Sequence, residues 1–310
     1  FKFRGTEKWN GGNNMPAKKA LLGFIGLGLM GQGFTKCLVD SGYEVIGYDI
    51  ELEKIRQANS HGVVSAKSCQ EVTEASDIIM ACVTTTQDLE VAVFGPNGIS
   101  AAASSNKVLI DHSTTALKNT KDMAVRLESE TGMGWVDAPV SGGPEGAEEG
   151  TLAIMAGGSE EHIANIQSVM RTVSTTFTVF GPTGSGQVAK MVNQILVLNN
   201  YVVLAEALAL AEAGGIDATK IPDALNAGHA GSNLLNRNFP LMIERNYLPR
   251  GFARQILKDL DALHDLGKEL KSPTPMSSQA ASLYRILVSK GYGELDGTAI
   301  LKLYDQNEMV

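Results

Sequence analysis

The sequence has few cysteines, and their arrangement excludes the chemistry of cysteine-rich proteins. Only Cys37, Cys69 and Cys82 occur, and their spacing is not that of metal ligands. We therefore expect buried thiols in a reducing, cytoplasmic compartment, and no bound metal. The chain also begins without the apolar segment of a signal peptide. Residues 1–14 are polar and rich in Gly and Asn, and we expect a cloning remnant or a disordered leader before a native start at Met15.

Long apolar runs and basic clusters are missing too. We find no apolar stretch of membrane-spanning length, and therefore expect no membrane partner. No run of five or more basic residues occurs and the net charge is −8, which argues against a nucleic-acid partner. The negative charge also means that local groups would have to hold an anionic substrate against an unfavourable overall field.

The sequence does contain enough apolar material for a large core. Of its 310 residues, 44% are hydrophobic and 19% are charged, which is typical of a globular protein. This length is long for one domain and comfortable for two. Composition therefore favours a globular chain of two domains.

A glycine-rich stretch near the beginning is the most informative motif. An apolar run, Ala20–Ile25, predicts a buried strand, and the residues Gln32–Ser41 predict a helix. Between them Gly26 permits a tight turn, Gly28 lets the backbone approach a pyrophosphate, and Gly31 lets helix and strand pack closely. The free N–H groups of the helix N-terminus favour phosphate. We therefore expect a dinucleotide site at the residues Gly26, Leu27, Gly28, Leu29, Met30 and Gly31.

An acidic residue at the end of the next strand indicates which dinucleotide is bound. The strand Tyr43–Tyr48 ends in Asp49, 18 residues after Gly31, and a carboxylate there can accept hydrogen bonds from the adenosine ribose hydroxyls. It would repel a 2′-phosphate, and no Arg follows at once, which favours NAD over NADP. The alternative is an ordinary solvated aspartate.

Strands and helices then alternate as far as Phe177–Phe180. This rhythm predicts a doubly wound, Rossmann-type, mainly parallel sheet of the α/β class. Polar clusters follow two of its strands, Thr84–Thr86 and Asp111–Thr114, where strand ends should line the cofactor crevice. His112 lies in the second cluster, but a histidine at a strand end is more often structural than catalytic.

A small-residue corner follows a later strand. Ser141, Gly142 and Gly143 would expose a hydroxyl and consecutive N–H groups, and such a nest binds carboxylate or phosphate oxygens. A tight loop that needs positive φ explains the same residues, and spacing alone does not decide between the two.

At residue 181 the pattern changes. Ser185–Ala213 has no helix breaker and is apolar on nearly every face, which predicts a helix buried on all sides, the spine of a second domain or of an oligomer. Only helical patterns follow, so we expect a dinucleotide domain over 15–181 and a helical domain over 182–310. Lys190 and Asn193 share one face of the long helix. A lysine in so apolar a helix is costly to bury unpaired, although it can also snorkel to the surface.

The chain resembles the β-hydroxyacid dehydrogenase family, which includes 3-hydroxyisobutyrate dehydrogenase and the tartronate, glyoxylate and succinic semialdehyde reductases. Four motifs match in order: the glycine stretch Gly23–Gly31, the corner Asp137–Gly143 with the glycines that follow it, Gly184-x-Gly186-x-x-x-Lys190-x-x-Asn193, and Lys258-Asp259-Leu260.

The resemblance implies roles for individual residues. Lys190 would be the general acid/base and Asn193 would orient the substrate, whose carboxylate Ser141, Gly142 and Gly143 would hold. Thr114 would lie near the nicotinamide and Lys258 would close over the cofactor, whose crevice Thr84 is expected to line from its position at a strand end. Family members pair through the helical domain, so the resemblance also implies a homodimer or homotetramer.

The function expected from these residues is the NAD-dependent interconversion of a small carboxylate-bearing 3-hydroxy acid and its semialdehyde. An imine reductase on the same fold is one alternative, but such relatives usually carry Asp or Tyr where this chain has Lys190. A nucleotide-binding scaffold without catalysis is another, against which the intact Lys190–Asn193 pair and the Ser-Gly-Gly corner argue.

Overall fold

A computed structural model describes residues 21–305, so the expected leader at 1–14 lies outside the described residues. The chain forms two compact units, one ending at Lys190 and the second beginning at Met191.

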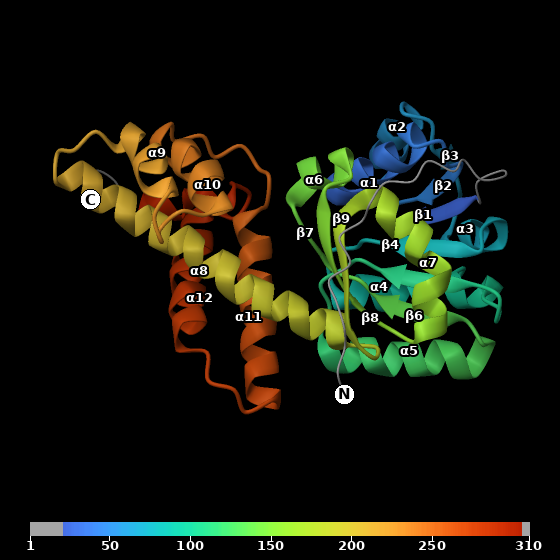
Figure 1. The fold of residues 1–310 in the computed structure, drawn as a ribbon. Helices are drawn as coiled ribbons and strands as arrows, with labels where there is room; N and C mark the ends of the chain where they lie inside the picture. Colours follow the sequence, from blue (N-terminus) through green and yellow to red (C-terminus); the bar gives the residue numbers. More distant parts are fainter. Residues whose placement is uncertain (1–20, 306–310) are drawn as a thin grey trace. The chain divides into compact units, whose positions relative to one another are not determined.

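The first unit is built on one twisted sheet (Figure 1). Its strand order is β3-β2-β1-β4-β5-β6-β8-β7, with β9 paired to β8. The pairs from β3 to β6 are parallel, β8 is antiparallel to β6 and β7, and β9 is parallel to β8. The predicted Rossmann-type parallel sheet is therefore confirmed, with an antiparallel addition at one side. The strands are β1 (Leu22–Ile25), β2 (Val45–Tyr48), β3 (Val64–Ser65), β4 (Ile78–Ala81), β5 (Val108–Asp111), β6 (Gly134–Asp137), β7 (Val140–Ser141), β8 (Leu152–Gly157) and β9 (Ser174–Gly181).

Helices cover both faces of this sheet, because successive strand residues point to opposite sides. Phe24 packs into a core with α1, α2, α6 and α7, whereas its neighbour Ile25 packs into a second core with α3, α4 and α5. Buried apolar side chains thus pack on both faces of the sheet. The helices are α1 (Leu29–Asp40), α2 (Leu52–Asn59), α3 (Cys69–Ala75), α4 (Thr86–Phe94), α5 (Leu117–Thr131), α6 (Gly143–Glu149) and α7 (Glu160–Val173), with a 3₁₀ turn at Ile99–Ala102.

The second unit is helical, as expected. Its core joins residues from the long helix α8 (Ser185–Ala213) to α10, α11 and α12, with the fully buried Phe239 and Tyr284 among the largest side chains. The other helices are α9 (Ile221–Asn226), α10 (Asn233–Ile243), α11 (Ala253–Glu269) and α12 (Pro275–Leu287). Two 3₁₀ helices lie at Ala218–Lys220 and Gly297–Leu303, and a π-helical segment lies at Val288–Tyr292.

Two expectations about α8 are corrected. The helix is not buried on all sides within this chain, because Val192, Leu196, Val203 and Leu210 are each more than half exposed. It is also long and apolar enough to cross a membrane by length and composition, contrary to the expectation that no stretch is. Its amide side chains interrupt the apolar run but carry no charge. A core helix passes the same test, and α8 packs its other face into the core of the second unit.

Candidate active site

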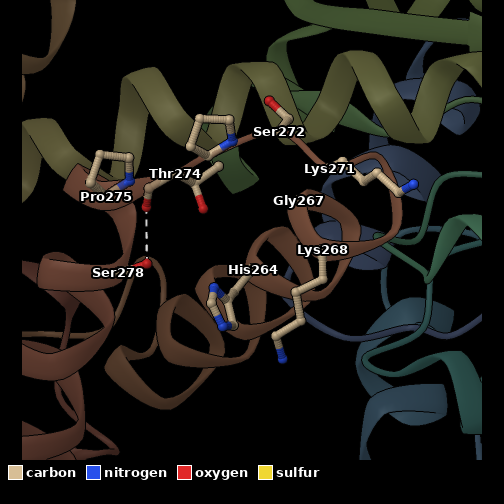
Figure 2. A pocket seen from close by; sticks show the side chains of 9 residues that line it. His264, Gly267, Lys268, Lys271, Ser272, Thr274, Pro275 and Ser278 are labelled. Carbon is tan, nitrogen blue, oxygen red and sulfur yellow. Dashed lines mark hydrogen bonds between the residues drawn. The ribbon is translucent and has the colours of Figure 1, made fainter.

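A hollow of about 500 Å³ lies at the turn between α11 and α12, lined by His264, Lys268, Lys271 and Ser278 among others (Figure 2). None of the residues that the sequence assigned to a site lines it. The candidate site is therefore built from the motifs and from the contacts around them.

The glycine loop after β1 has a different constraint at each glycine. Gly26 has φ +90°, and a Cβ there would lie 2.3 Å from the Cys82 carbonyl oxygen. A Cβ at Gly31 would lie 2.1 Å from the Gly26 carbonyl oxygen, whereas a Cβ at Gly28 would meet no atom within 4 Å. Gly26 and Gly31 therefore shape the loop, while Gly28 leaves open space beside the backbone. This arrangement fits a pyrophosphate on the N-terminus of α1.

Alanine at Gly31 should lower the stability of the fold, whereas alanine at Gly28 should weaken dinucleotide binding. Gly31→Ala should lower the free energy of unfolding by about 1–3 kcal/mol, because its methyl group overlaps backbone. Gly28→Ala should unfold at the wild-type temperature, since its φ of −70° suits alanine, yet weaken dinucleotide binding at least about tenfold by filling the phosphate side. Thermal melts and cofactor titrations measure both. Unweakened binding in Gly28→Ala would contradict the placement of the phosphate.

The Asp49 carboxylate forms a hydrogen bond with the glycine loop itself. Its Oδ2 accepts the Leu27 N–H at 2.7 Å and its Oδ1 accepts the Glu51 N–H at 2.9 Å, and the residue is buried. The carboxylate thus fixes the glycine loop as well as ending β2. Sequence reasoning missed this contact, which joins residues 22 positions apart.

The polar clusters after β4 and β5 lie together, because Ala81 and Asp111 are partners in the sheet. The Val83 N–H donates to Ser113 Oγ at 2.9 Å, which brings the backbone beside Thr84 close to that beside Thr114. At these strand ends Thr84 is exposed and Thr114 is half-buried.

His112 has a structural environment. Its ring stacks on Phe34 with centroids 4.7 Å apart, and its Nδ1–H donates to the Ala138 carbonyl at 2.7 Å. Burial lowers the pKa of His112 to about 4. The ring is therefore neutral at physiological pH and joins α1 to the β6–β7 connection.

The Ser-Gly-Gly corner lies where β7 passes into α6. Gly142 has φ +136° and Gly143 has φ +72°, so both adopt backbone conformations that other residues avoid. Helix α6 packs closely on α1: a Cβ at Gly33 would lie 2.8 Å from the Pro144 carbonyl oxygen. Gly33 therefore brings the corner against the helix that carries the glycine loop, a contact that the sequence motif did not reveal.

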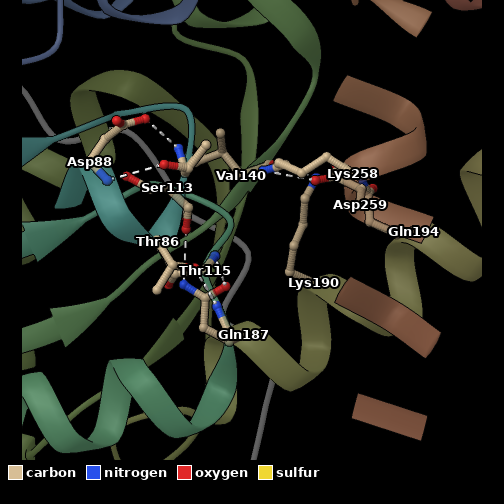
Figure 3. A network of polar contacts seen from close by, with 12 residues as sticks. Thr86, Asp88, Ser113, Thr115, Val140, Gln187, Lys190, Gln194, Lys258 and Asp259 are labelled. Carbon is tan, nitrogen blue, oxygen red and sulfur yellow. Dashed lines mark hydrogen bonds and ion pairs between the residues drawn. The ribbon is translucent and has the colours of Figure 1, made fainter. Parts of the chain in front are cut away.

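Lys190 lies beside this corner within the same unit. Its Nζ donates to the Val140 carbonyl oxygen at 2.8 Å, and the side chain is buried (Figure 3). Val140 directly precedes Ser141, so the ammonium group is held one residue from the proposed anion nest. A substrate anion at the corner would thus present its reactive carbon near a proton donor.

In the second unit a chain of polar contacts links Asn193 to Lys258. Asn193 Nδ2 donates to Gln194 Oε1 at 2.9 Å, and Gln194 Nε2 donates to Asp259 Oδ2 at 2.6 Å. The Lys258 ammonium pairs with Asp259 Oδ1 at 3.1 Å. Gln194 and Asp259 therefore orient the two residues to which the family motif assigned roles.

Two buried carboxylates end neighbouring strands. Asp111 and Asp137 are fully buried partners on β5 and β6. Burial raises the pKa of Asp111 to about 7 and that of Asp137 to about 6.

Asp111 should make stability depend on pH. A carboxyl whose folded pKa lies above its unfolded value of about 4 stabilises the fold at low pH, and this contribution is lost as pH rises toward about 7. Asp111→Asn lacks the titration, so its melting temperature should gain on the wild type between pH 4 and 7, by about 2–4 °C for each kcal/mol. Melts across this range test this, and a constant difference would contradict it.

None of the three cysteines, all of which lie within the described residues, forms a disulfide; Cys37 and Cys69 are buried and Cys82 is half-buried. Burial raises the pKa of the Cys69 thiol to about 11. Within residues 21–305, no three His, Cys, Asp or Glu side chains gather in a way that could hold a metal ion.

Comparison with known proteins gives a consistent result. Residues 21–181 match the NAD binding domain of 6-phosphogluconate dehydrogenase, and residues 184–304 match the NAD-binding domain of NADP-dependent 3-hydroxyisobutyrate dehydrogenase. The chain is 35% identical to 2-hydroxy-3-oxopropionate reductase of Escherichia coli, covering 91% of this chain and 96% of that one. It is 32% identical to 2-(hydroxymethyl)glutarate dehydrogenase of Eubacterium barkeri, covering 93% and 96%.

A solved structure has a similar fold. Mycobacterium tuberculosis 3-hydroxyisobutyrate dehydrogenase, determined with L-serine, superimposes with a TM-score of 0.81 at 26% identity, covering 93% of this chain and 99% of that one.

Proposed function

The chain belongs to the β-hydroxyacid dehydrogenase family, and we propose that it interconverts a small 3-hydroxy acid and its semialdehyde with NAD. As a member of this family, the chain is an NAD(P)-dependent dehydrogenase that acts on CH–OH groups. The observation that carries the finer proposal is the Lys190 ammonium, fixed on the Val140 carbonyl directly before Ser141.

In the proposed reaction Lys190 moves a proton to or from the substrate oxygen. When bound, the nicotinamide supplies or accepts the hydride. In the reductive direction the ammonium stabilises the negative charge that develops on the carbonyl oxygen and then protonates it. In the oxidative direction the neutral amine removes the hydroxyl proton. A lysine is ordinarily protonated at neutral pH, which suits reduction.

The corner Ser141–Gly143 would hold the carboxylate of the substrate. Its N–H groups and hydroxyl can take an anion without a cationic side chain, and positive φ at both glycines turns the backbone sharply there. The names of the two sequence relatives also refer to short acids that carry hydroxyl groups. Asn193 would orient the substrate and Lys258 would lie at the cofactor, both held through Asp259.

Asp49 should make the enzyme prefer NAD, because its carboxylate would accept the ribose hydroxyls and repel a 2′-phosphate. Asp49→Ser with Ile50→Arg should reverse the preference, since Ile50 is 85% exposed and can accept a long side chain. Asp49→Asn is the matched control: it removes the charge and keeps an oxygen for the Leu27 N–H. The ratio of kcat/KM for the two cofactors measures the effect. A wild-type preference for NADP would contradict this proposal.

We also propose a soluble, cytoplasmic homodimer or homotetramer. Val192, Leu196, Val203 and Leu210 follow at intervals of four and seven, so they form one exposed apolar stripe along α8. Covering such a stripe with a second copy would remove apolar surface from water. Light scattering of the purified protein measures the assembly, and a monomer at micromolar concentration would refute it.

The experiment that tests the proposed reaction is a panel of short hydroxyacids and semialdehydes. Absorbance at the nicotinamide band is followed in both directions with NAD and NADP. We expect turnover with a carboxylate-bearing member of the panel. Binding of NADH with no turnover of any member would leave a nucleotide-binding protein without this activity.

A further inference from the structure

Asp137, the last residue of β6, accepts hydrogen bonds from the beginning of α8. Its Oδ1 accepts the Gly184 N–H at 2.6 Å and its Oδ2 accepts the Gln187 N–H at 3.0 Å. The first N–H groups of a helix have no partner within the helix, and a negative charge is favourable at that end. The fully buried carboxylate at the end of β6 therefore caps α8 from outside.

Two glycines make this contact close. A Cβ at Gly186 would lie 2.8 Å from Asp137 Oδ2 and 2.5 Å from the Met155 carbonyl oxygen. A Cβ at Gly157, on the neighbouring strand, would lie 2.8 Å from Asp137 Oδ1. Backbone surrounds the carboxylate from both sides. A side chain at Gly186 or Gly157 would therefore push the first turn of α8 away from the carboxylate.

Gln187 provides a second anchor for the same turn. Its Nε2 donates to the Ser113 carbonyl at 2.9 Å and its Oε1 accepts the Thr115 N–H at 3.1 Å (Figure 3). These atoms belong to the segment that follows β5, on either side of Thr114. The helix start is thus tied to the ends of two adjacent strands.

Lys190 follows Gln187 by three residues, slightly less than one helical turn. Its Nζ donates to the carbonyl of Val140, three residues after Asp137 on the same segment. The segment Asp137–Val140 therefore fixes both the start of α8 and the ammonium group. We infer that Asp137, with Gln187, is a positioning residue that sets Lys190 against the Ser141 corner. The inference rests on the proposed role of Lys190.

The acceptor pattern distinguishes Asp137 from its neighbour Asp111. Both oxygens of Asp137 accept backbone N–H groups, so an asparagine amide would place a donor against a donor. Asp111 accepts one backbone N–H, from Ser113, and its other oxygen faces the Thr115 hydroxyl at 3.4 Å, which can reverse its role. Asparagine therefore fits at position 111 and not at position 137. The two substitutions are matched in chemistry, burial and location.

The test compares Asp137→Asn, Asp111→Asn, Lys190→Ala and the double variant Asp137→Asn/Lys190→Ala. Sites that bind NADH are counted by fluorescence titration, and kcat is expressed per binding site. Misplacement of about 1 Å can lower a rate about 100-fold. We expect Asp137→Asn to lower kcat per site about 10–100-fold with NADH affinity kept. Asp111→Asn should lower kcat per site by a much smaller factor, because an asparagine oxygen can still accept the Ser113 N–H. In the Lys190→Ala background Asp137→Asn should change the rate less than about twofold.

Equal effects of the two asparagine variants would overturn the inference. So would an undiminished effect of Asp137→Asn in the Lys190→Ala background, which indicates a merely structural role. If Asp137→Asn does not fold, Gln187→Met takes its place, because it removes both side-chain hydrogen bonds of Gln187. Gln187→Met should then lower kcat per site in the wild type and change it less than about twofold in the Lys190→Ala background. Full activity of Lys190→Ala would instead refute the proposed function, so the two failures are distinguishable.

Discussion

Replacing Lys190 by alanine is expected to lower kcat about 10²–10⁴-fold, the usual contribution of general acid/base transfer. The loss should appear in kcat, because the proton moves only in the transition state, while NADH affinity stays unchanged. The structural basis is the ammonium held 2.8 Å from the Val140 carbonyl, next to the corner that would bind the substrate anion. Steady-state kinetics and NADH titration measure both quantities.

Lys107 provides the matched control. Its Nζ also donates to a carbonyl, that of Ser76, at 2.6 Å, and its side chain is only 11% exposed. Lys107→Ala removes a similar buried contact in the same unit and should leave kcat within about twofold. A Lys190→Ala variant that keeps half of the wild-type rate would refute the assignment of the acid/base.

A neutral analogue of the substrate should react much more slowly than the acid. Hydrogen bonds to a charged group contribute about 1.5–3 kcal/mol, so replacing the carboxylate by an amide should lower kcat/KM about 10–150-fold. The carboxylate would also orient the carbonyl toward Lys190, so kcat should fall as well as KM rise. Initial rates with a semialdehyde acid and its amide of equal length measure this difference.

Ser141→Ala tests whether the Ser141–Gly143 corner causes the difference in kcat/KM between the acid and the amide. It removes one donor to the anion, so it should slow the acid more than the amide and narrow the gap between them. Comparable kcat/KM for acid and amide in the wild type would refute the anion nest. An unchanged gap in Ser141→Ala would place the anion elsewhere.

The sequence predicted the parts of this molecule that local patterns determine. Strand and helix periodicity predicted the Rossmann-type sheet, and the constraints at Gly26 and Gly31 follow from a turn of defined shape. The helical second unit followed from the absence of any strand pattern after residue 181. Each of these features depends on residues close together in the chain.

The remainder depends on contacts between distant residues. The hydrogen bonds of Asp137 cross 47 and 50 residues, and no spacing rule specifies them. The antiparallel pairing of β8 likewise follows from how the chain returns to the sheet rather than from strand composition. The exposed stripe on α8 was missed because apolar composition alone does not show which face the chain itself covers.

Hydride transfer to the substrate is tested most directly with NADH that carries deuterium at both C4 positions, so that transfer from either face of the ring delivers deuterium. The labelled cofactor is mixed with the enzyme and the semialdehyde acid that is most active in the panel, and the product is examined by NMR. If hydride passes from NADH to the carbonyl carbon, the product carries one deuterium on the carbon that bears the new hydroxyl group, and one NADH is oxidised for each product formed. A product without deuterium at that carbon, or bound NADH with no product from any carboxylate-bearing aldehyde, would contradict this transfer.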